Sequence, residues 1–274
     1  MWEVLGFFLA TAIGLTMVLA AGRRGSTRHN NYPWLLEETA KLHVGIMGIL
    51  AGFAFTGIVL VVTFARDRPG VPDSALDTVI VMFLVSYLFW VGNAFLISYM
   101  PHVDASGDIV QRVHFTLAST IEYRTVFLSW FALLPLLQAN GLGRLAYVLY
   151  FLLPASLLLG SVIIAMASDG LGLVRISETY LSAAVGTGLA LAYTAVIAFA
   201  APGARSPYSS LHLAVVIFCL NTAGFGLAAL TPLSSQYPSI KRFYEKYGRR
   251  LAIGDMQLTI LSLAFLWLGI VGAI

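Results

Sequence analysis

The chain has 274 residues, of which 59% are hydrophobic and 11% are charged, and its mean hydropathy is +0.85. Soluble domains carry about 25% charged residues, so this composition excludes an ordinary soluble globular protein and predicts a chain built for lipid. The net charge is +3, but no basic run with exposed aromatic residues is expected outside the apolar segments. Nucleic-acid binding is therefore not expected, and the excess of basic residues is typical of cytoplasmic membrane loops.

The apolar sequence divides into eight segments, and about 20 apolar residues suffice for a helix to cross a bilayer. The predicted spans are 2–21, 42–64, 76–100, 114–137, 145–167, 180–201, 211–230 and 251–274. Little chain is left for a soluble domain, so the prediction is an all-α, polytopic bundle forming a single transmembrane domain over 1–274. A cleaved signal peptide is the alternative for the first segment. Glu3 precedes its apolar run where a basic residue would be typical, which favours a retained span.

The basic residues predict how the spans are oriented. With eight spans, eleven of them fall on one side: Arg23, Arg24, Arg28, Lys41, Arg112, Arg175, Lys241, Arg242, Lys246, Arg249 and Arg250. Four fall on the other side, namely Arg66, Arg68, Arg144 and Arg205. Loops rich in Lys and Arg stay in the cytoplasm. We therefore predict a multi-pass protein of the inner (plasma) membrane, with both termini extracytoplasmic. A seven-span arrangement would need one re-entrant segment and would weaken this asymmetry.

Small residues line one face of the predicted span 42–64. Gly45, Gly48, Gly52 and Thr56 follow at spacings of three and four residues, the pattern that lets two membrane helices approach closely. The sequence does not say whether the partner helix belongs to the same chain or to another subunit. Packing within the chain is the simpler expectation, and a homo-oligomer is the alternative.

The span 114–137 carries Glu122 and Arg124 inside an otherwise apolar run. An ion in the hydrocarbon costs about 2.5–3.5 kcal/mol or more, so each needs a partner or water. The two are two positions apart and point to different sides of a helix, which predicts separate partners. Asp255 is the expected counter-ion of Arg124, and Asn93 is an expected donor to Glu122.

Polar residues of four further spans fall at a similar depth, in the half of the membrane predicted to be cytoplasmic. They are His43, Asn93, Asn221, Asp255 and Gln257. A satisfied polar network that fixes how the helices pack is one interpretation. The functional interpretation is a hydrated vestibule, and it predicts a channel or transporter for a small ion, protons included, or for a small solute. Two alternatives stay open. One is a membrane enzyme that uses Glu122 or His43 as acid or base on a lipid-like substrate, and the other is a non-catalytic sensor or assembly subunit.

The segment 231–250 is expected to be a cytoplasmic loop that contains a short amphipathic helix. Its basic residues predict contact with the anionic headgroups of membrane lipids, and they are Lys241, Arg242, Lys246, Arg249 and Arg250. The same surface would serve the assembly-subunit alternative.

No motif of a cofactor, metal or nucleotide site occurs. The histidines show no HxxxH or HxxE spacing, the lone Cys219 excludes an intrachain disulfide, and there is no Walker-A loop or G-x-S-x-G elbow. We therefore predict no metal, no cofactor and no catalytic residue. The run EYRTVFLSWFALLPLL is similar to the third helix of microbial rhodopsins, which bind retinal through a lysine of their last helix. Lys41, Lys241 and Lys246 are the only lysines here and none lies inside a predicted span, so a retinal Schiff base is excluded.

Overall fold

The computed structural model describes residues 33–65, 73–99, 108–142, 144–145, 148–149 and 210–271. Five long helices account for most of them: α2 (Pro33–Leu60), α3 (Asp73–Ser98), α4 (Asp108–Ala139), α7 (Ser210–Leu230) and α8 (Pro238–Val271). A π-helical turn, η1 (Val61–Ala65), extends α2, and a 3₁₀ turn, η3 (Thr231–Ser235), follows α7. The described part of the chain contains no strand, as the all-α prediction requires. The predicted spans 2–21 and 180–201, and nearly all of 145–167, lie outside the described residues.

Three of the described helices are long and apolar enough to cross a membrane. They cover Ala40–Thr63, Leu76–Ser98 and Val215–Ser235, which overlap the predicted spans 42–64, 76–100 and 211–230. The composition of these helices is that of a membrane protein. The helix α4 contains the predicted span 114–137 and α8 contains residues 251–271 of the last predicted span, but neither helix is among these three. The total of eight spans and the location of the termini stay predictions.

Two helix boundaries differ from the prediction. The helix α4 begins at Asp108, six residues before the predicted start of its span. The basic segment, predicted as a loop with a separate short helix, forms the first turns of α8, which runs without a break from Pro238. Proline suits the first turn of a helix, and no further proline interrupts the sequence before Val271. Most of the segment is therefore helical as predicted, but its helix continues directly into the predicted span 251–274.

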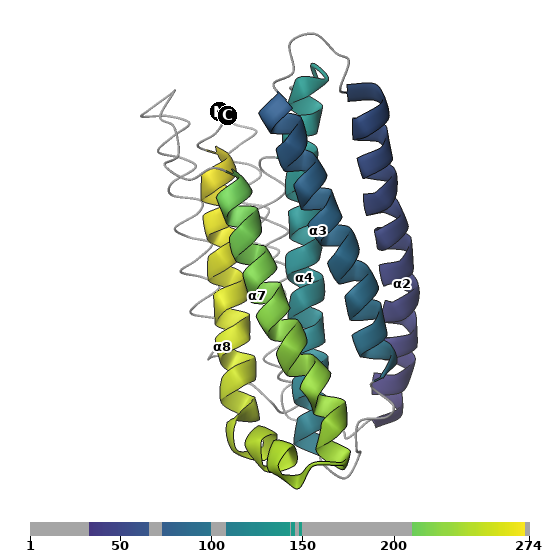
Figure 1. The fold of residues 1–274 in the computed structure, drawn as a ribbon, viewed down its shortest axis with the longest axis vertical. Coiled ribbons are helices and arrows are strands. Elements are labelled where there is room, and N and C mark those ends of the chain that lie inside the picture. The colour runs from purple at the N-terminus through teal and green to yellow at the C-terminus, as the bar shows by residue number, and fades with distance from the viewer. Residues whose placement is uncertain are drawn as a thin grey trace, which may run out of the picture.

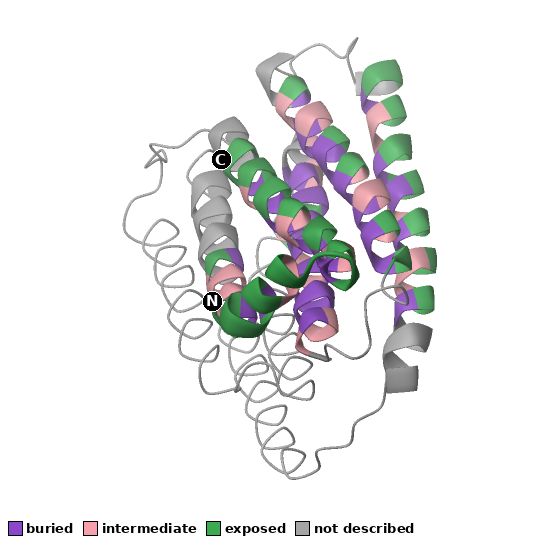
Figure 2. Ribbon diagram, turned by 60° about the horizontal axis from the view of Figure 1, so that its bottom comes forward, coloured by how far each residue is buried: buried purple, intermediate pink, exposed green. Residues whose placement is uncertain are grey.

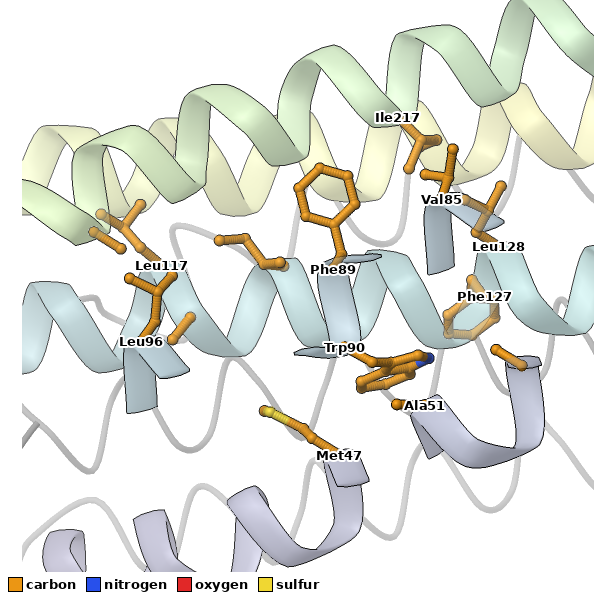
Figure 3. Packing of buried hydrophobic residues seen from close by; sticks show 14 of the residues in the cluster. Met47, Ala51, Val85, Phe89, Trp90, Leu96, Leu117, Phe127, Leu128 and Ile217 are labelled. Carbon is orange, nitrogen blue, oxygen red and sulfur yellow. The ribbon is translucent and has the colours of Figure 1, made fainter. Parts of the chain in front are cut away.

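The five helices run up and down in alternation along the long axis of the molecule (Figure 1). The helix α4 lies at the centre of the described bundle and packs against α3, α7 and α8, while α2 packs against α3. The side chains between them are large and apolar: Figure 3 shows Met47, Phe89, Trp90, Phe127 and Leu128 filling the space between the ribbons. The outer side of α2 is exposed along its length (Figure 2), as expected for a face that meets lipid.

Close approach of α2 to α3 depends on a glycine outside the predicted small-residue face. A Cβ atom on Gly57 would lie 3.1 Å from the ring of Phe83, which is tighter than an ordinary van der Waals contact, so the absence of a side chain here lets the ring pack directly against α2. In contrast, a Cβ atom on Gly45, Gly48 or Gly52 would meet nothing within 4 Å in the described structure. The helix surface predicted from these three residues thus faces away from α3, and its role in packing stays a prediction.

Basic residues collect at one end of the described bundle. Seven lie toward the end where α2, α4 and α8 begin, namely Lys41, Arg112, Lys241, Arg242, Lys246, Arg249 and Arg250. At the opposite end the described residues include one, Arg144, beyond the last turn of α4. The helices therefore carry a strong charge asymmetry from end to end.

Candidate functional site

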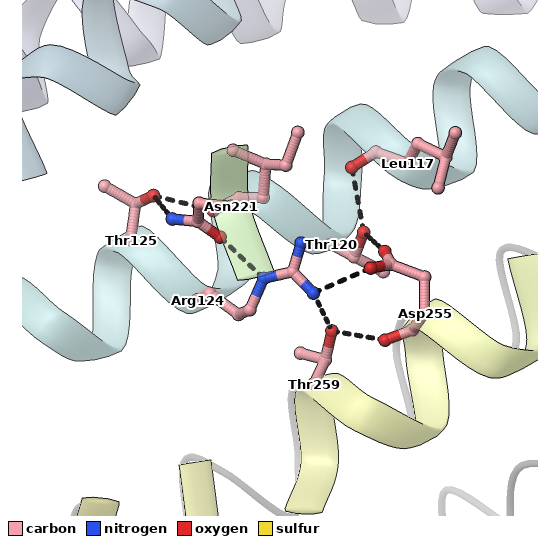
Figure 4. Close-up of polar contacts among 8 residues, drawn as sticks. Leu117, Thr120, Arg124, Thr125, Asn221, Asp255 and Thr259 are labelled. Carbon is pink, nitrogen blue, oxygen red and sulfur yellow. Dashed lines mark hydrogen bonds and ion pairs between the residues drawn. The ribbon is translucent and has the colours of Figure 1, made fainter. Parts of the chain in front are cut away.

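The guanidinium group of Arg124 joins three helices near the middle of the bundle (Figure 4). Arg124 lies on α4 and is fully buried. Its Nε donates to Oδ1 of Asn221 on α7 at 2.6 Å, and its Nη1 donates to Oδ1 of Asp255 on α8 at 2.9 Å. The same Nη1 donates to the hydroxyl of Thr259, one turn further along α8, at 2.7 Å. The charge on Arg124 is thus neutralised by Asp255 and held in a fixed orientation.

Hydroxyl and amide groups complete this arrangement around Asp255 and Asn221. The hydroxyl of Thr120 donates to the second carboxylate oxygen of Asp255. The amide Nδ2 of Asn221 donates to the hydroxyl of Thr125 at 3.2 Å. These contacts satisfy both carboxylate oxygens and both ends of the amide, which is what a buried ion pair requires to offset the loss of hydration. We call Arg124, Asp255, Asn221, Thr120, Thr125 and Thr259 the arginine cluster.

One donor of the arginine cluster has no acceptor in the part of the chain that the structure describes. Among the described residues, Nη2 of Arg124 makes no hydrogen bond although the atom is buried. A Cβ atom on Gly224 would lie 3.0 Å from Nη2, so the guanidinium group packs directly against the backbone of α7 there. A buried donor without an acceptor costs about 1–3 kcal/mol, which the other contacts of the cluster must outweigh.

A second polar pair joins α2 to α4. Nδ1 of His43 lies 2.7 Å from Oε2 of Glu122, and the imidazole ring packs near the ring of Phe115 at a centroid distance of 6.0 Å. The side chains of His43 and Glu122 remain 25% and 16% exposed, in contrast to the fully buried Arg124. His43 also lies within the membrane-length segment Ala40–Thr63. This pair is an acid and a base in an apolar setting that keeps partial access to the surroundings.

The structure confirms one of the two expected pairings and contradicts the other. Asp255 is the counter-ion of Arg124, as predicted. The prediction that Asn93 donates to Glu122 was wrong: Nδ2 of Asn93 donates to the backbone oxygen of Ala118 at 2.9 Å, one turn earlier on α4. The carboxylate of Glu122 binds His43 instead. The depth of Asn93 along α3 does not determine how α3 is rotated about its axis. This rotation directs the amide of Asn93 to Ala118 and not to Glu122.

The predicted polar layer therefore divides into separate groups. His43 with Glu122 and Arg124 with Asn221 and Asp255 form two of them, on different sides of α4. Asn93 stands apart, bonded only to the backbone of α4 among the described residues. Gln257 is part-exposed and lies two positions after Asp255, which turns it toward a different side of α8.

His114 is a buried polar residue whose contacts the sequence did not predict. Its Nε2 donates to the backbone oxygen of Leu96 at 2.9 Å, near the end of α3. Its Nδ1 lies 2.5 Å from the hydroxyl of Thr231 and 3.0 Å from the backbone oxygen of Ala228, at the end of α7. The last carbonyl groups of a helix lack partners within it, so a histidine placed between two helix ends is a natural partner for them. His114 thus fastens the ends of α3 and α7 to the start of α4.

The described residues contain no group of three or more His, Cys, Asp or Glu side chains that could hold a metal ion. The chemistry offered by this part of the chain is that of hydrogen bonds, one ion pair and one acid–base pair. No family model, no curated protein and no solved structure matches the chain.

Proposed function

We propose that the protein is an integral membrane channel or transporter for a small ion, that the ion is the proton, and that it binds at the His43–Glu122 pair. The observation that carries this proposal is the location of the pair. An acid and a base lie 2.7 Å apart on two apolar helices, and both keep part of their surface exposed. Ionisable residues inside membrane helices are costly and mark ion paths more often than they serve packing alone.

The arginine cluster has a different role from the His43–Glu122 pair in this proposal. Arg124 is fully buried, and three of its hydrogen bonds go to α7 and α8, so an ion has no access to it in this conformation. We infer that the cluster positions α4 against α7 and α8, and that it does not bind the transported ion. Asn221 belongs to this cluster, while Asn93 and Gln257 are proposed as hydrogen-bonding groups beside the path.

The chemistry of the pair suits proton transfer. A proton on Nδ1 of His43 can pass to the carboxylate of Glu122 along their hydrogen bond, while Nε2 is left to exchange a proton with water. An imidazole ring offers two nitrogens for this purpose and changes its charge in the physiological range. His43 and Glu122 together therefore form a minimal relay between two helices.

The charge asymmetry supports the orientation of the proposed bundle. Among the described residues, the end where α2, α4 and α8 begin carries seven basic residues against one at the other end, so we assign it to the cytoplasm. His43 lies ten residues after the start of α2, which puts the relay in the cytoplasmic half. In the proposal, eight spans cross the inner (plasma) membrane and both termini are extracytoplasmic.

Proton flux into liposomes tests the proposal. The purified protein is reconstituted with a pH-sensitive dye inside the vesicles, and a membrane potential drives protons inward. We expect Glu122→Gln and His43→Gln to lower the flux to the level of empty liposomes. Asp77→Asn is the matched control, because Asp77 is an exposed carboxylate of α3 outside the pair. Wild-type flux in both variants of the pair would overturn the proposal.

A further inference from the structure

The first turns of α8, Pro238–Arg250, form a surface segment at the basic end of the bundle (Figure 1). Two inward-facing residues fasten the segment. The hydroxyl of Tyr244 donates to the backbone oxygen of Leu227 on α7 at 2.5 Å, and a Cβ atom on Gly248 would lie 2.7 Å from a methyl carbon of Val113 on α4. Tyr244 and Gly248 are both buried and are four positions apart, so they share one side of the helix.

The opposite side of the surface segment is basic. Arg242, Lys246, Arg249 and Arg250 follow one another at spacings of four, three and one. An α-helix has about 3.6 residues per turn, so this spacing gathers the four side chains on one side, away from Tyr244 and Gly248. All four residues are exposed. The single acid of the segment, Glu245, lies at the border between the two sides.

Aromatic side chains occupy the flank beside the basic side. Phe243 is 40% and Tyr247 is 37% exposed, and their ring centroids lie 5.5 Å apart. The ammonium group of Lys246 lies 5.0 Å from the centre of the Tyr247 ring. The sequence-based expectation that no basic run carries exposed aromatic residues is thus wrong for this segment. Figure 2, which turns the basic end toward the viewer, shows the segment exposed along much of its length.

We propose that this basic side binds the phosphate headgroups of anionic phospholipids in the membrane that surrounds the protein. Guanidinium and ammonium groups match phosphate in charge and hydrogen bonding, and exposed aromatic rings beside them are typical of the interface between hydrocarbon and water. The same helix continues into the predicted span 251–274, which brings the segment to headgroup depth. The inference requires that the bundle lies in a bilayer, but it does not depend on proton transport.

Lipid retention by the full-length protein tests the inference. The protein in detergent micelles is titrated with dioleoyl phosphatidylglycerol or dioleoyl phosphatidylcholine, and the bound lipids are counted by native mass spectrometry. We expect wild type to prefer the anionic lipid. The triple variant Arg242→Gln, Lys246→Gln, Arg250→Gln should lose about fivefold in affinity for each charge removed, with unchanged affinity for phosphatidylcholine.

Three comparisons separate charge recognition from loss of fold. Arg242→Lys with Arg250→Lys keeps the charge and should retain most of the preference for the anionic lipid. Glu245→Gln removes the acid and should increase that preference. Arg144→Gln, an exposed arginine at the other end of the bundle, should leave it unchanged.

Four results would overturn the inference. One is an equal preference for the anionic lipid in the triple variant and in wild type. Another is a loss of preference for the anionic lipid in Arg144→Gln that equals the loss in the triple variant. The third is displacement of the lipid by inorganic phosphate more strongly than by chloride of the same ionic strength, which would identify a site for free phosphate. The last is displacement of the bound lipid by a short single-stranded RNA. None of these measurements reads flux, so failure here leaves the transport proposal to its own test.

Discussion

Gly224 on α7 leaves the space that the guanidinium group of Arg124 occupies on α4. A Cβ atom at this position would lie 3.0 Å from Nη2 and 3.4 Å from a side-chain carbon of Ile121. The guanidinium group cannot move aside easily, because its other nitrogens are held by Asn221, Asp255 and Thr259. The absence of a single methyl group therefore determines how closely α4 and α7 approach.

The first prediction concerns this contact. Gly224→Ala should lower the free energy of unfolding by about 1–3 kcal/mol, because the added carbon overpacks the arginine cluster. Thermal unfolding of the purified protein in detergent measures the effect. Gly226→Ala is the matched control on the same helix: a Cβ atom there meets nothing within 4 Å, so its stability should equal or slightly exceed that of wild type. Equal melting of the two variants would contradict the role assigned to Gly224.

The second prediction concerns the ion pair. Asp255→Leu leaves the buried charge of Arg124 without its counter-ion and should cost about 3–5 kcal/mol. Arg124→Leu should be similarly harmful, because it leaves the carboxylate of Asp255 unpaired. The double variant should be more stable than either single variant, since it removes both charges together. Additive losses in this double-mutant cycle would show that the two residues act independently.

The third prediction concerns His114. His114→Leu removes the hydrogen bond from Nε2 to Leu96 at the end of α3 and the contact of Nδ1 with the hydroxyl of Thr231 just after α7, and it should lower the free energy of unfolding by about 1–3 kcal/mol. Thermal unfolding in detergent is again the measurement. Thr222→Val is the control, because among the described residues the exposed hydroxyl of Thr222 bonds only to the backbone oxygen of Phe218 on its own helix. If His114→Leu melts at the wild-type temperature, the residue does not fasten these helix ends.

The fourth prediction concerns Tyr244 and pH. Burial raises the pKa of Tyr244 to about 12, above its usual value of 10.0. The folded state therefore favours the protonated phenol, so its contribution to stability is fully present below pH 10 and is lost as the pH rises toward 12. Tyr244→Phe should cost about 1 kcal/mol through loss of the bond to Leu227. The stability difference between wild type and this variant should be constant near neutral pH and should shrink above pH 10.

The exposed Tyr247 provides the control for that experiment. Tyr247→Phe removes a hydroxyl three positions along the same helix that is not buried, and it should change stability little. A difference between wild type and Tyr244→Phe that stays constant through pH 11 would contradict the assigned cause.

The sequence predicted the parts of the fold that follow from hydropathy and from the cost of charge in lipid. The apolar segments 42–64, 76–100 and 211–230 correspond to membrane-length helices, and the need of Arg124 for a counter-ion led to Asp255. The first result depends only on the composition along each helix. The second depends on the small number of charged residues inside the predicted spans that could pair with Arg124.

The errors have two causes. Depth along a helix does not determine rotation about its axis, so Asn93 was paired with Glu122, whereas it reaches Ala118 one turn away. His114 was not among the predicted site residues, because most of its contacts go to carbonyl groups of the backbone, which no side-chain pattern reveals. The pairing of His43 with Glu122 was also missed because depth does not determine helix rotation, although both were predicted site residues.

The unbroken course of α8 has a mechanical consequence. Arg250 and Asp255 are five residues apart on one helix, which separates them by about 7.5 Å along its axis. The arginine proposed to bind lipid headgroups and the carboxylate that holds Arg124 therefore lie on one continuous helix, so a rotation of this part of α8 about its axis would move both. Binding of anionic lipid at Arg250, as proposed above, would then be coupled to the ion pair between Asp255 and Arg124.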